Sequence, residues 1–250
     1  MIKMEIYDTL IIGSGYTSAG YSASHPKTII CEEREALDTS FYLPLSGFRH
    51  HPYAPKSNEG KRLLEIFGSL SLFDGDVQNT NGFESAFCTY LTEREIPVLL
   101  KCRVVSKKML DGGIIDATVQ TNEGLTHLFT KKIIDARCKV GDKTLTVLFV
   151  ADDIEGARRE LLREFEGAMV EPAFYDGRCA LRIPIFDMDE NTVKPFIYKK
   201  WQTLTSGAKI LFIAPAFSLS GDGNPMADES YNNPIEAFEA GFFFEGGDEL

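Results

Sequence analysis

The sequence contains no CxxC pair, and its cysteines are few and widely spaced. This spacing excludes a zinc ribbon and a thioredoxin-like redox pair. An odd number of cysteines within apolar stretches is typical of reduced, buried thiols in a reducing compartment. We therefore expect no metal site at the five cysteines, which are Cys31, Cys88, Cys102, Cys138 and Cys179.

Long apolar runs are also absent. The longest, 210–217, is far shorter than a membrane span and already contains Pro215. Glu5 and Asp8 interrupt the N-terminal region, and the apolar run 10–12 is too short for the core of a signal peptide. The sequence therefore predicts a cytoplasmic protein with no membrane partner.

Basic residues are outnumbered, since 26 Lys and Arg face 37 Asp and Glu and give a net charge of −11. A chain this acidic repels phosphate backbones, which argues against a nucleic-acid partner, although a local basic cleft could hold a small anionic ligand. With 250 residues, 44% of them hydrophobic and 25% charged, the composition is that of a soluble globular protein. The length suits one large domain or one domain with a modest insertion.

The first readable unit is a strand, a glycine turn, a helix and a second strand. The strand 6–12 carries three consecutive apolar residues, as a parallel strand covered on both faces does. The turn Gly13-Ser14-Gly15 follows at once, then a helix over 16–24 and a strand over 28–31 that ends at Glu32. This order predicts a βαβ opening.

Each part of that opening suits a dinucleotide. Gly13 permits a tight turn, Gly15 leaves room for a diphosphate, and the N–H groups of the following helix attract phosphate. Ser18 stands where a third glycine is usual, and it is still small enough for close packing of the helix. Glu32 can accept hydrogen bonds from both ribose hydroxyls, which favours FAD or NAD over NADP. The alternative is a tight turn that binds no nucleotide.

The rest of the chain divides into a cofactor domain and an insertion. We expect an irregular segment over 38–60 and a mixed series of helices and strands beyond it. The expected helices are 61–70, 83–94, 154–165 and 234–243, and the expected strands are 98–107, 114–121, 125–129, 132–135, 144–151, 178–186, 196–201 and 209–214. The predicted fold class is α/β, a Rossmann-type domain with a parallel sheet and an antiparallel meander in three layers. A small β-rich cap over 142–205 would divide this domain into 1–141 and 206–250.

Four segments give the chain a resemblance to a known family. They are 7–15 with Glu32-Glu33-Arg34, the strand 96–105, the segment 132–137, and 210–214 followed by 232–238. In these segments the sequence resembles the FAD-dependent oxidoreductases of the glutathione-reductase-like, two-dinucleotide-binding-fold type. It departs from them at Ser18, at Arg137-Cys138 in place of Thr-Gly, and at Ala214-Pro215 in place of Gly-Asp.

The resemblance implies an FAD cofactor, with the flavin near the start of the helix at Pro234 and hydride transfer to or from a small-molecule substrate. The strand at Val104 would contact the adenine through its backbone. The implied cofactor-binding residues are Gly13, Ser14, Gly15, Thr17, Ser18, Glu32, Glu33, Arg34, Val104, Asp135, Ala136 and Asn233.

No catalytic residue is assigned from the sequence. His50 or His51 could act as a general base, or the two could be a solvated loop pair. Asp222 could replace the missing Gly-Asp carboxylate only if its loop folds back. The phenylalanines at 242–244 favour core packing, with a homodimer contact as the alternative. Two further functions stay open: a non-catalytic adenine-nucleotide-binding descendant of a flavoenzyme, and an NAD-binding enzyme without flavin.

Overall fold

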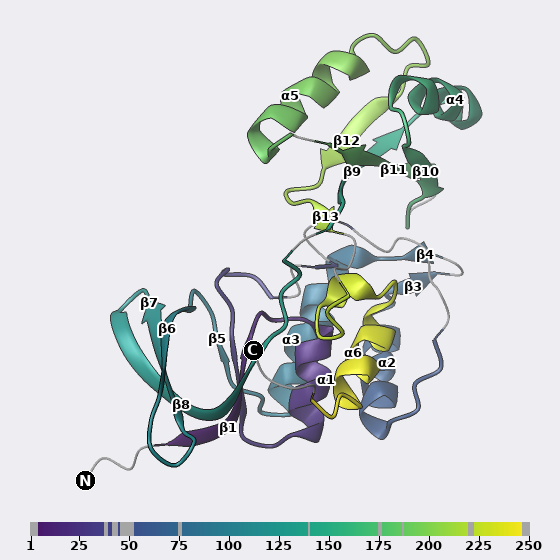
Figure 1. Cartoon of the computed structure of the whole chain (residues 1–250). Helices are drawn as coiled ribbons and strands as arrows, with labels where there is room; N and C mark the ends of the chain where they lie inside the picture. The colour runs from purple at the N-terminus through teal and green to yellow at the C-terminus, as the bar shows by residue number, and fades with distance from the viewer. Residues whose placement is uncertain are drawn as a thin grey trace.

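The computed structural model describes residues 5–37, 40, 41, 45, 53–74, 77–139, 141–174, 177–186, 188–219 and 223–246. Two bodies are visible in Figure 1, an α/β unit and a smaller cap that contains its own sheet. His50, His51 and Asp222, which the sequence singled out, lie outside the described residues.

The α/β unit is built on a six-stranded sheet in the order β5-β2-β1-β8-β7-β6. Strands β5, β2, β1 and β8 are parallel, and β8, β7 and β6 form an antiparallel meander. The strands are β1 (Ile6–Ile12), β2 (Thr28–Cys31), β5 (Val98–Leu99), β6 (Arg103–Met109), β7 (Ile115–Thr121) and β8 (Gly124–Asp135).

Strand β8 belongs to both halves of this sheet. Its first part pairs with β7, and from Phe129 to Asp135 it pairs with β1. The sequence had suggested two strands, 125–129 and 132–135, but hydrogen bonding to two partners in turn keeps the backbone extended throughout. The expected strand 98–107 is instead two strands, because the chain leaves β5 at residue 100 and enters the meander at Arg103.

Helices cover one face of the parallel strands. They are α1 (Tyr16–Ser24), α2 (Asn58–Ser69), α3 (Phe83–Glu93) and α6 (Pro234–Phe242), with the short elements β3 (Phe73–Asp74), β4 (Val77–Gln78), η1 (Thr80–Gly82) and η2 (Asp228–Ser230) between them. Aromatic side chains, among them Tyr16, Phe67 and Phe87, fill the space between the helices. This cluster makes the helical layer the largest apolar core of the α/β unit.

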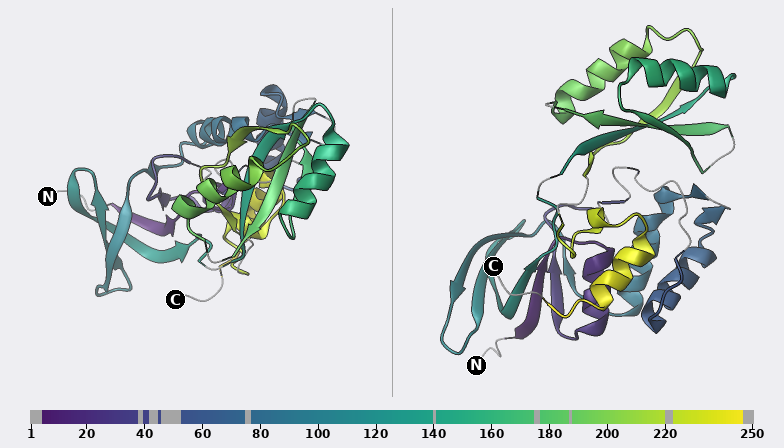
Figure 2. Two further views of the ribbon diagram at one scale, coloured as in Figure 1. Left: turned by 90° about the horizontal axis from the view of Figure 1, so that it is seen from above. Right: turned by 45° about the vertical axis from the view of Figure 1, so that its right-hand side comes forward.

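Helices α1 and α6 touch backbone to backbone. A Cβ on Gly20 would run into the carbonyl of Phe238, and one on Gly241 would run into the carbonyl of Thr17. The small residues of α1 thus serve its packing against α6. The two helices lie side by side in both views of the molecule (Figure 1, Figure 2).

The meander packs on the opposite face of the parallel strands. Leu10 and Ile29 face it and contact Ala117 and Val119 of β7, whereas Ile11 faces the helices. Helices, parallel sheet and meander form three layers, which confirms the α/β fold class predicted from the sequence.

The cap contains a second, antiparallel sheet in the order β10-β11-β9-β12, with the short β13 also paired with β9. Helices α4 and α5 cover the face of this sheet that is turned away from the α/β unit (Figure 1, Figure 2). The elements are β9 (Lys143–Val150), α4 (Ile154–Glu164), β10 (Met169–Pro172), β11 (Arg178–Ile185), α5 (Glu190–Trp201), β12 (Lys209–Ile213) and β13 (Ser218–Leu219).

Two expectations for the cap were wrong. Residues 196–201, predicted as a strand, form the end of α5, which starts with a capping box between Asp189 and Thr192. Val193, Ile197 and Trp201 recur at helical spacing and enter the cap core. Strand β12, predicted as the last strand of the cofactor domain, pairs with β9, so the cap sheet extends to Leu219 rather than ending before residue 206.

Candidate functional site

The glycine turn lies between the carboxyl end of β1 and the start of α1. In open α/β sheets, ligands bind at the carboxyl ends of the strands. Gly13 has a φ of +101°, in the region that favours glycine, and its N–H donates to the carbonyl of Cys31 at 2.8 Å. Ser18, fully buried in α1, donates its hydroxyl to the carbonyl of Gly13 at 2.8 Å. The third small position therefore ties the helix to the turn.

The N-terminus of α1 holds a carboxylate from a distant part of the chain. The backbone N–H groups of Tyr16 and Thr17 donate to Asp228 at 2.7 and 2.8 Å, and the hydroxyl of Thr17 donates to it at 2.8 Å. A Cβ on Gly15 would lie 2.6 Å from the nearer carboxylate oxygen. Gly15 is therefore needed for space, and the space is filled by Asp228.

Burial raises the pKa of the Asp228 carboxyl to about 6, against the lowering effect of hydrogen bonds from Thr17 and Tyr16. The nearby charge of Glu229 raises this pKa further. A carboxylate in this position is stabilised by the helix dipole and destabilised by the loss of water.

Glu32 points toward the turn rather than away from it. One of its carboxylate oxygens accepts the N–H and the hydroxyl of Ser14, each at 2.8 Å, and the other accepts the N–H of Arg34 at 2.9 Å. The side chain is buried at the end of β2. Glu32 thus lies beside the glycine turn, where the sequence placed it.

Arg137 crosses the turn from the end of β8. Its guanidinium donates to Asp135 at 2.9 and 3.0 Å and to Glu33 at 2.8 Å. Burial raises the pKa of the Asp135 carboxyl, but the hydrogen bonds from Arg137 outweigh burial and hold that pKa below its ordinary value. Arg137 thus forms ion pairs with two carboxylates, one from β8 and one from the end of β2.

These groups surround a cavity of about 230 Å³. Among its described lining residues are four carboxylates, from Glu32, Glu33, Asp228 and Glu229, and two guanidinium groups, from Arg34 and Arg137. The remaining lining residues are Gly13, Ser14, Gly15, Ser40, Ala136, Cys138, Phe217 and Leu219. Leu219 belongs to β13 and Phe217 directly precedes this strand, so the last strand of the cap sheet lies at one side of the cavity.

The residues around the turn fit the diphosphate of a dinucleotide in their donor set. Two helix N–H groups and one hydroxyl converge on a single position in front of Gly15, and an anion of the chain itself already occupies it. A diphosphate can use these donors only where Asp228 is not bound to them.

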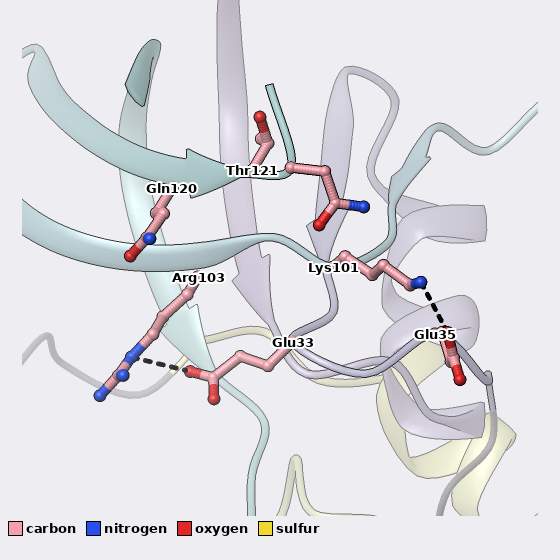
Figure 3. A pocket seen from close by; sticks show the side chains of 7 residues that line it. Glu33, Glu35, Lys101, Arg103, Gln120 and Thr121 are labelled. Atoms are coloured by element: carbon pink, nitrogen blue, oxygen red, sulfur yellow. Dashed lines mark ion pairs between the residues drawn. The ribbon is translucent and has the colours of Figure 1, made fainter. Parts of the chain in front are cut away.

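A second, more open hollow of about 470 Å³ adjoins the first and shares Glu33 with it (Figure 3). Lys101 pairs with Glu35 at 2.6 Å, and Arg103 lies 3.8 Å from Glu33. Gln120, Thr121 and Asn122 of the meander complete the lining. Val104, next to Arg103, turns its side chain into the core beneath the meander.

Other predicted site residues lie elsewhere. Asn233 is buried and caps α6, accepting the N–H groups of Ile235 and Glu236. Asp228, which completes the site, was not predicted, since no local pattern marks a residue whose partners lie more than 200 positions away. Within the described ranges no group of three or more His, Cys, Asp or Glu side chains could hold a metal ion.

No disulfide links the five cysteines. Cys31, Cys102 and Cys179 are buried, as the apolar surroundings of the cysteines predicted. Among the described helices none is long and apolar enough to cross a bilayer.

No family model and no curated protein match the sequence. Solved structures do match by shape. The p-nitrophenol 4-monooxygenase PnpA from Pseudomonas putida has a TM-score of 0.53 and 10% identity, over 86% of this chain and 68% of the other. A geranylgeranyl bacteriochlorophyll reductase-like protein from Thermoplasma acidophilum has a TM-score of 0.57 and 12% identity, over 96% and 77%. CabE, an aromatic hydroxylase from angucycline biosynthesis, has a TM-score of 0.51 and 11% identity, over 83% and 51%.

These similarities refine the resemblance seen in the sequence. They are with monooxygenases, hydroxylases and a reductase-like protein, and they do not single out the glutathione-reductase-like type. The chain spans about half the length of CabE. At this level of identity the similarity establishes the fold alone, which this chain shares with the monooxygenase, the hydroxylase and the reductase-like protein.

Proposed function

We propose that this chain is an FAD-binding oxidoreductase that transfers a hydride between a small molecule and flavin. The observation that carries the proposal is the convergence of the Gly13–Gly15 turn, the N-terminus of α1 and the Glu32 carboxylate on one cavity at the carboxyl edge of the sheet. In open α/β sheets this edge is the usual place for a nucleotide.

Different residues of the chain would bind different parts of the cofactor. The N–H groups of Tyr16 and Thr17 would hold the diphosphate in front of Gly15, and Glu32 would accept the ribose hydroxyls. Because a carboxylate repels a 2′-phosphate, Glu32 favours FAD or NAD over NADP. The base would extend past Glu33 into the second hollow, beside Arg103, the residue before Val104 (Figure 3).

Further residues would frame these groups. Ser14 orients Glu32, and Ser18 holds the turn. Ala136 lines the cavity, and Asp135 beside it holds the guanidinium of Arg137. Glu33 and Arg34 lie at the rim of the cavity.

The flavin would supply the chemistry of hydride transfer. Asn233 starts α6, whose N-terminal dipole favours negative charge nearby, and this remains the position proposed for the flavin end. The face of the cap sheet that α4 and α5 leave uncovered is turned toward the α/β unit, where a substrate would meet the cofactor (Figure 2).

The test is direct. The purified chain is examined for flavin absorption and for FAD released by heat, and the cofactor-free protein is titrated with FAD, ADP and NADH. We expect FAD and ADP to bind and Glu32→Gln to weaken both. Glu65→Gln is the matched control, since Glu65 of α2 is exposed, pairs with Arg62 and is absent from the described lining of both hollows. Tight NADH binding without FAD binding, or a Glu32→Gln variant with unchanged affinity, would overturn the proposal.

A second candidate function has an observation of its own. The Asp228 carboxylate takes the diphosphate position, and the cavity is lined by more acidic than basic groups. Both features favour a non-catalytic descendant that keeps a weak adenine-nucleotide site. A colourless protein that binds ADP weakly, with no flavin reduction, identifies this alternative.

A further inference from the structure

We propose that Asp228 is an internal competitor of the cofactor, and that the diphosphate binds only when this carboxylate leaves the N-terminus of α1. The inference rests on the proposed function, because it concerns the regulation of the same site. It gives the chain a closed state, which the structure shows, and an open state able to take an anion.

Competition follows from the geometry of the donors. The N–H groups of Tyr16 and Thr17 point at Asp228 from 2.7 and 2.8 Å, so the position in front of them is filled by its oxygens. A phosphate group at the same donors would overlap the carboxylate and repel it. The two anions therefore exclude each other at this position.

The position differs from the starts of four other described helices. Helix α3 also has a glycine without a side-chain cap at its start, Gly82, but it continues directly from η1. Helices α2, α4, α5 and α6 begin with a local side-chain cap, from Ser57, Asp153, Asp189 and Asn233 respectively. The residue before α1, at the capping position, is Gly15. It has no side chain, so the N–H groups of the first turn are open to another group. The N-terminus of α1 is capped instead by Asp228 of η2, 212 positions after Tyr16 in the sequence.

Glu239 is a second buried carboxylate that accepts backbone N–H groups at the start of a helix, and its role is structural. Glu239 of α6 accepts the N–H groups of Lys56 and Ser57 ahead of α2, but it is absent from the described lining of both hollows. Asp228 makes similar contacts and also lines the cavity. Glu239 is therefore a matched control for effects on folding alone.

The competition has a simple quantitative consequence. If only a small fraction of molecules is open, the apparent affinity for the cofactor falls by that fraction. Removing the carboxylate removes the closed state. We expect FAD to bind Asp228→Ala at least about tenfold more tightly than the wild-type chain, which corresponds to about 1.4 kcal/mol.

The experiment uses two probes on the full chain, FAD followed by its fluorescence and inorganic pyrophosphate followed by the shift in Tm. The variants are Asp228→Ala and the isosteric Asp228→Asn, so that a folding defect in one leaves the other. Glu229→Gln removes a charge from the same cavity without freeing the helix donors, and Glu239→Gln controls for a buried carboxylate elsewhere. We expect pyrophosphate to raise the Tm of the Asp228 variants more than that of the wild type or either control.

Each outcome is decisive. Equal affinity for FAD in the wild type and the Asp228 variants overturns the competition and leaves the proposed function standing. A gain in Glu229→Gln as large as in Asp228→Asn assigns the effect to general charge and also overturns it. Stabilisation of the Asp228 variants by pyrophosphate without FAD binding supports the competition and overturns the proposed function. If neither probe binds any variant, both fail.

Discussion

Glu32 and Ser14 are joined twice, since one carboxylate oxygen of Glu32 accepts both the N–H and the hydroxyl of Ser14 at 2.8 Å. The contact links the end of β2 to the glycine turn after β1. Glu32, which we propose as the ribose-binding side chain, therefore has a structural role as well.

The first prediction concerns that double role. From the sequence, a substitution at Glu32 is expected to weaken cofactor binding with little loss of stability, because the residue lies at a strand end. The structure revises the second part, since the buried carboxylate accepts three hydrogen bonds from Ser14 and Arg34. We expect Glu32→Ala to lower the free energy of unfolding by about 1–3 kcal/mol, measured by urea denaturation. A loss no larger than that of Glu35→Ala would contradict this role.

The second prediction tests the contact between Gly15 and Asp228. The backbone at Gly15 is extended, so alanine is strained only by its Cβ, which would lie 2.6 Å from the carboxylate. Gly15→Ala should destabilise the fold by about 1–3 kcal/mol. In the Asp228→Ala background the same substitution should have a smaller effect, with a coupling of about 0.5–3 kcal/mol in the double-mutant cycle. Additive changes in the free energy of unfolding would show that Gly15 and Asp228 are not in contact.

The third prediction follows from the raised pKa of Asp228, about 6 against an ordinary 3.8. The folded state binds the proton more tightly than the unfolded state, so this group stabilises the fold below pH 3.8 and that contribution is lost as the pH rises through 6. Relative to Asp228→Asn, the wild type should lose about 3 kcal/mol of unfolding free energy between these limits. Glu229 and Tyr231 also face Asp228 and are present in both proteins. Parallel pH profiles of wild type and variant would refute the assignment.

The fourth prediction compares three glycines within helices. Gly20→Ala and Gly241→Ala place a methyl group against the carbonyls of Phe238 and Thr17 across the α1–α6 contact. Each should lower Tm, with a loss of about 1–3 kcal/mol or more, because backbone cannot move aside as a side chain can. Gly68→Ala in α2 meets no atom within 4 Å and should instead gain about 0.5–1 kcal/mol from helix propensity. Similar effects at all three positions would contradict the close packing.

The opening of the fold was predictable because its signals are local. A buried strand, a glycine turn and a carboxylate at the end of the next strand each follow from neighbouring residues, and Gly13, Gly15 and Glu32 lie where those signals place them. The meander was predictable for the same reason, since turn residues separate its strands.

The features that were predicted wrongly or missed depend on residues that are distant in the sequence. The apolar strand at Lys209–Ile213 suits either sheet by composition, and only its pairing with β9 assigns it to the cap. Residues 196–201 alternate like a strand over a short window, whereas the helical spacing from Val193 to Trp201 emerges over a longer one. Asp228 reaches α1 from a short helical turn near the other end of the chain, and no spacing rule connects the two.

The contact between α1 and α6 also affects how the chain is made. Helix α1 precedes the cap in the sequence, and α6 follows it. Until α6 leaves the ribosome, the side of α1 that carries Gly20 has no partner to pack against. Asp228, which caps α1, is synthesised only shortly before α6. The interior of the α/β unit is therefore completed only after α6 has been made, whereas the cap sheet, whose strands all lie between β8 and α6 in the sequence, can form earlier.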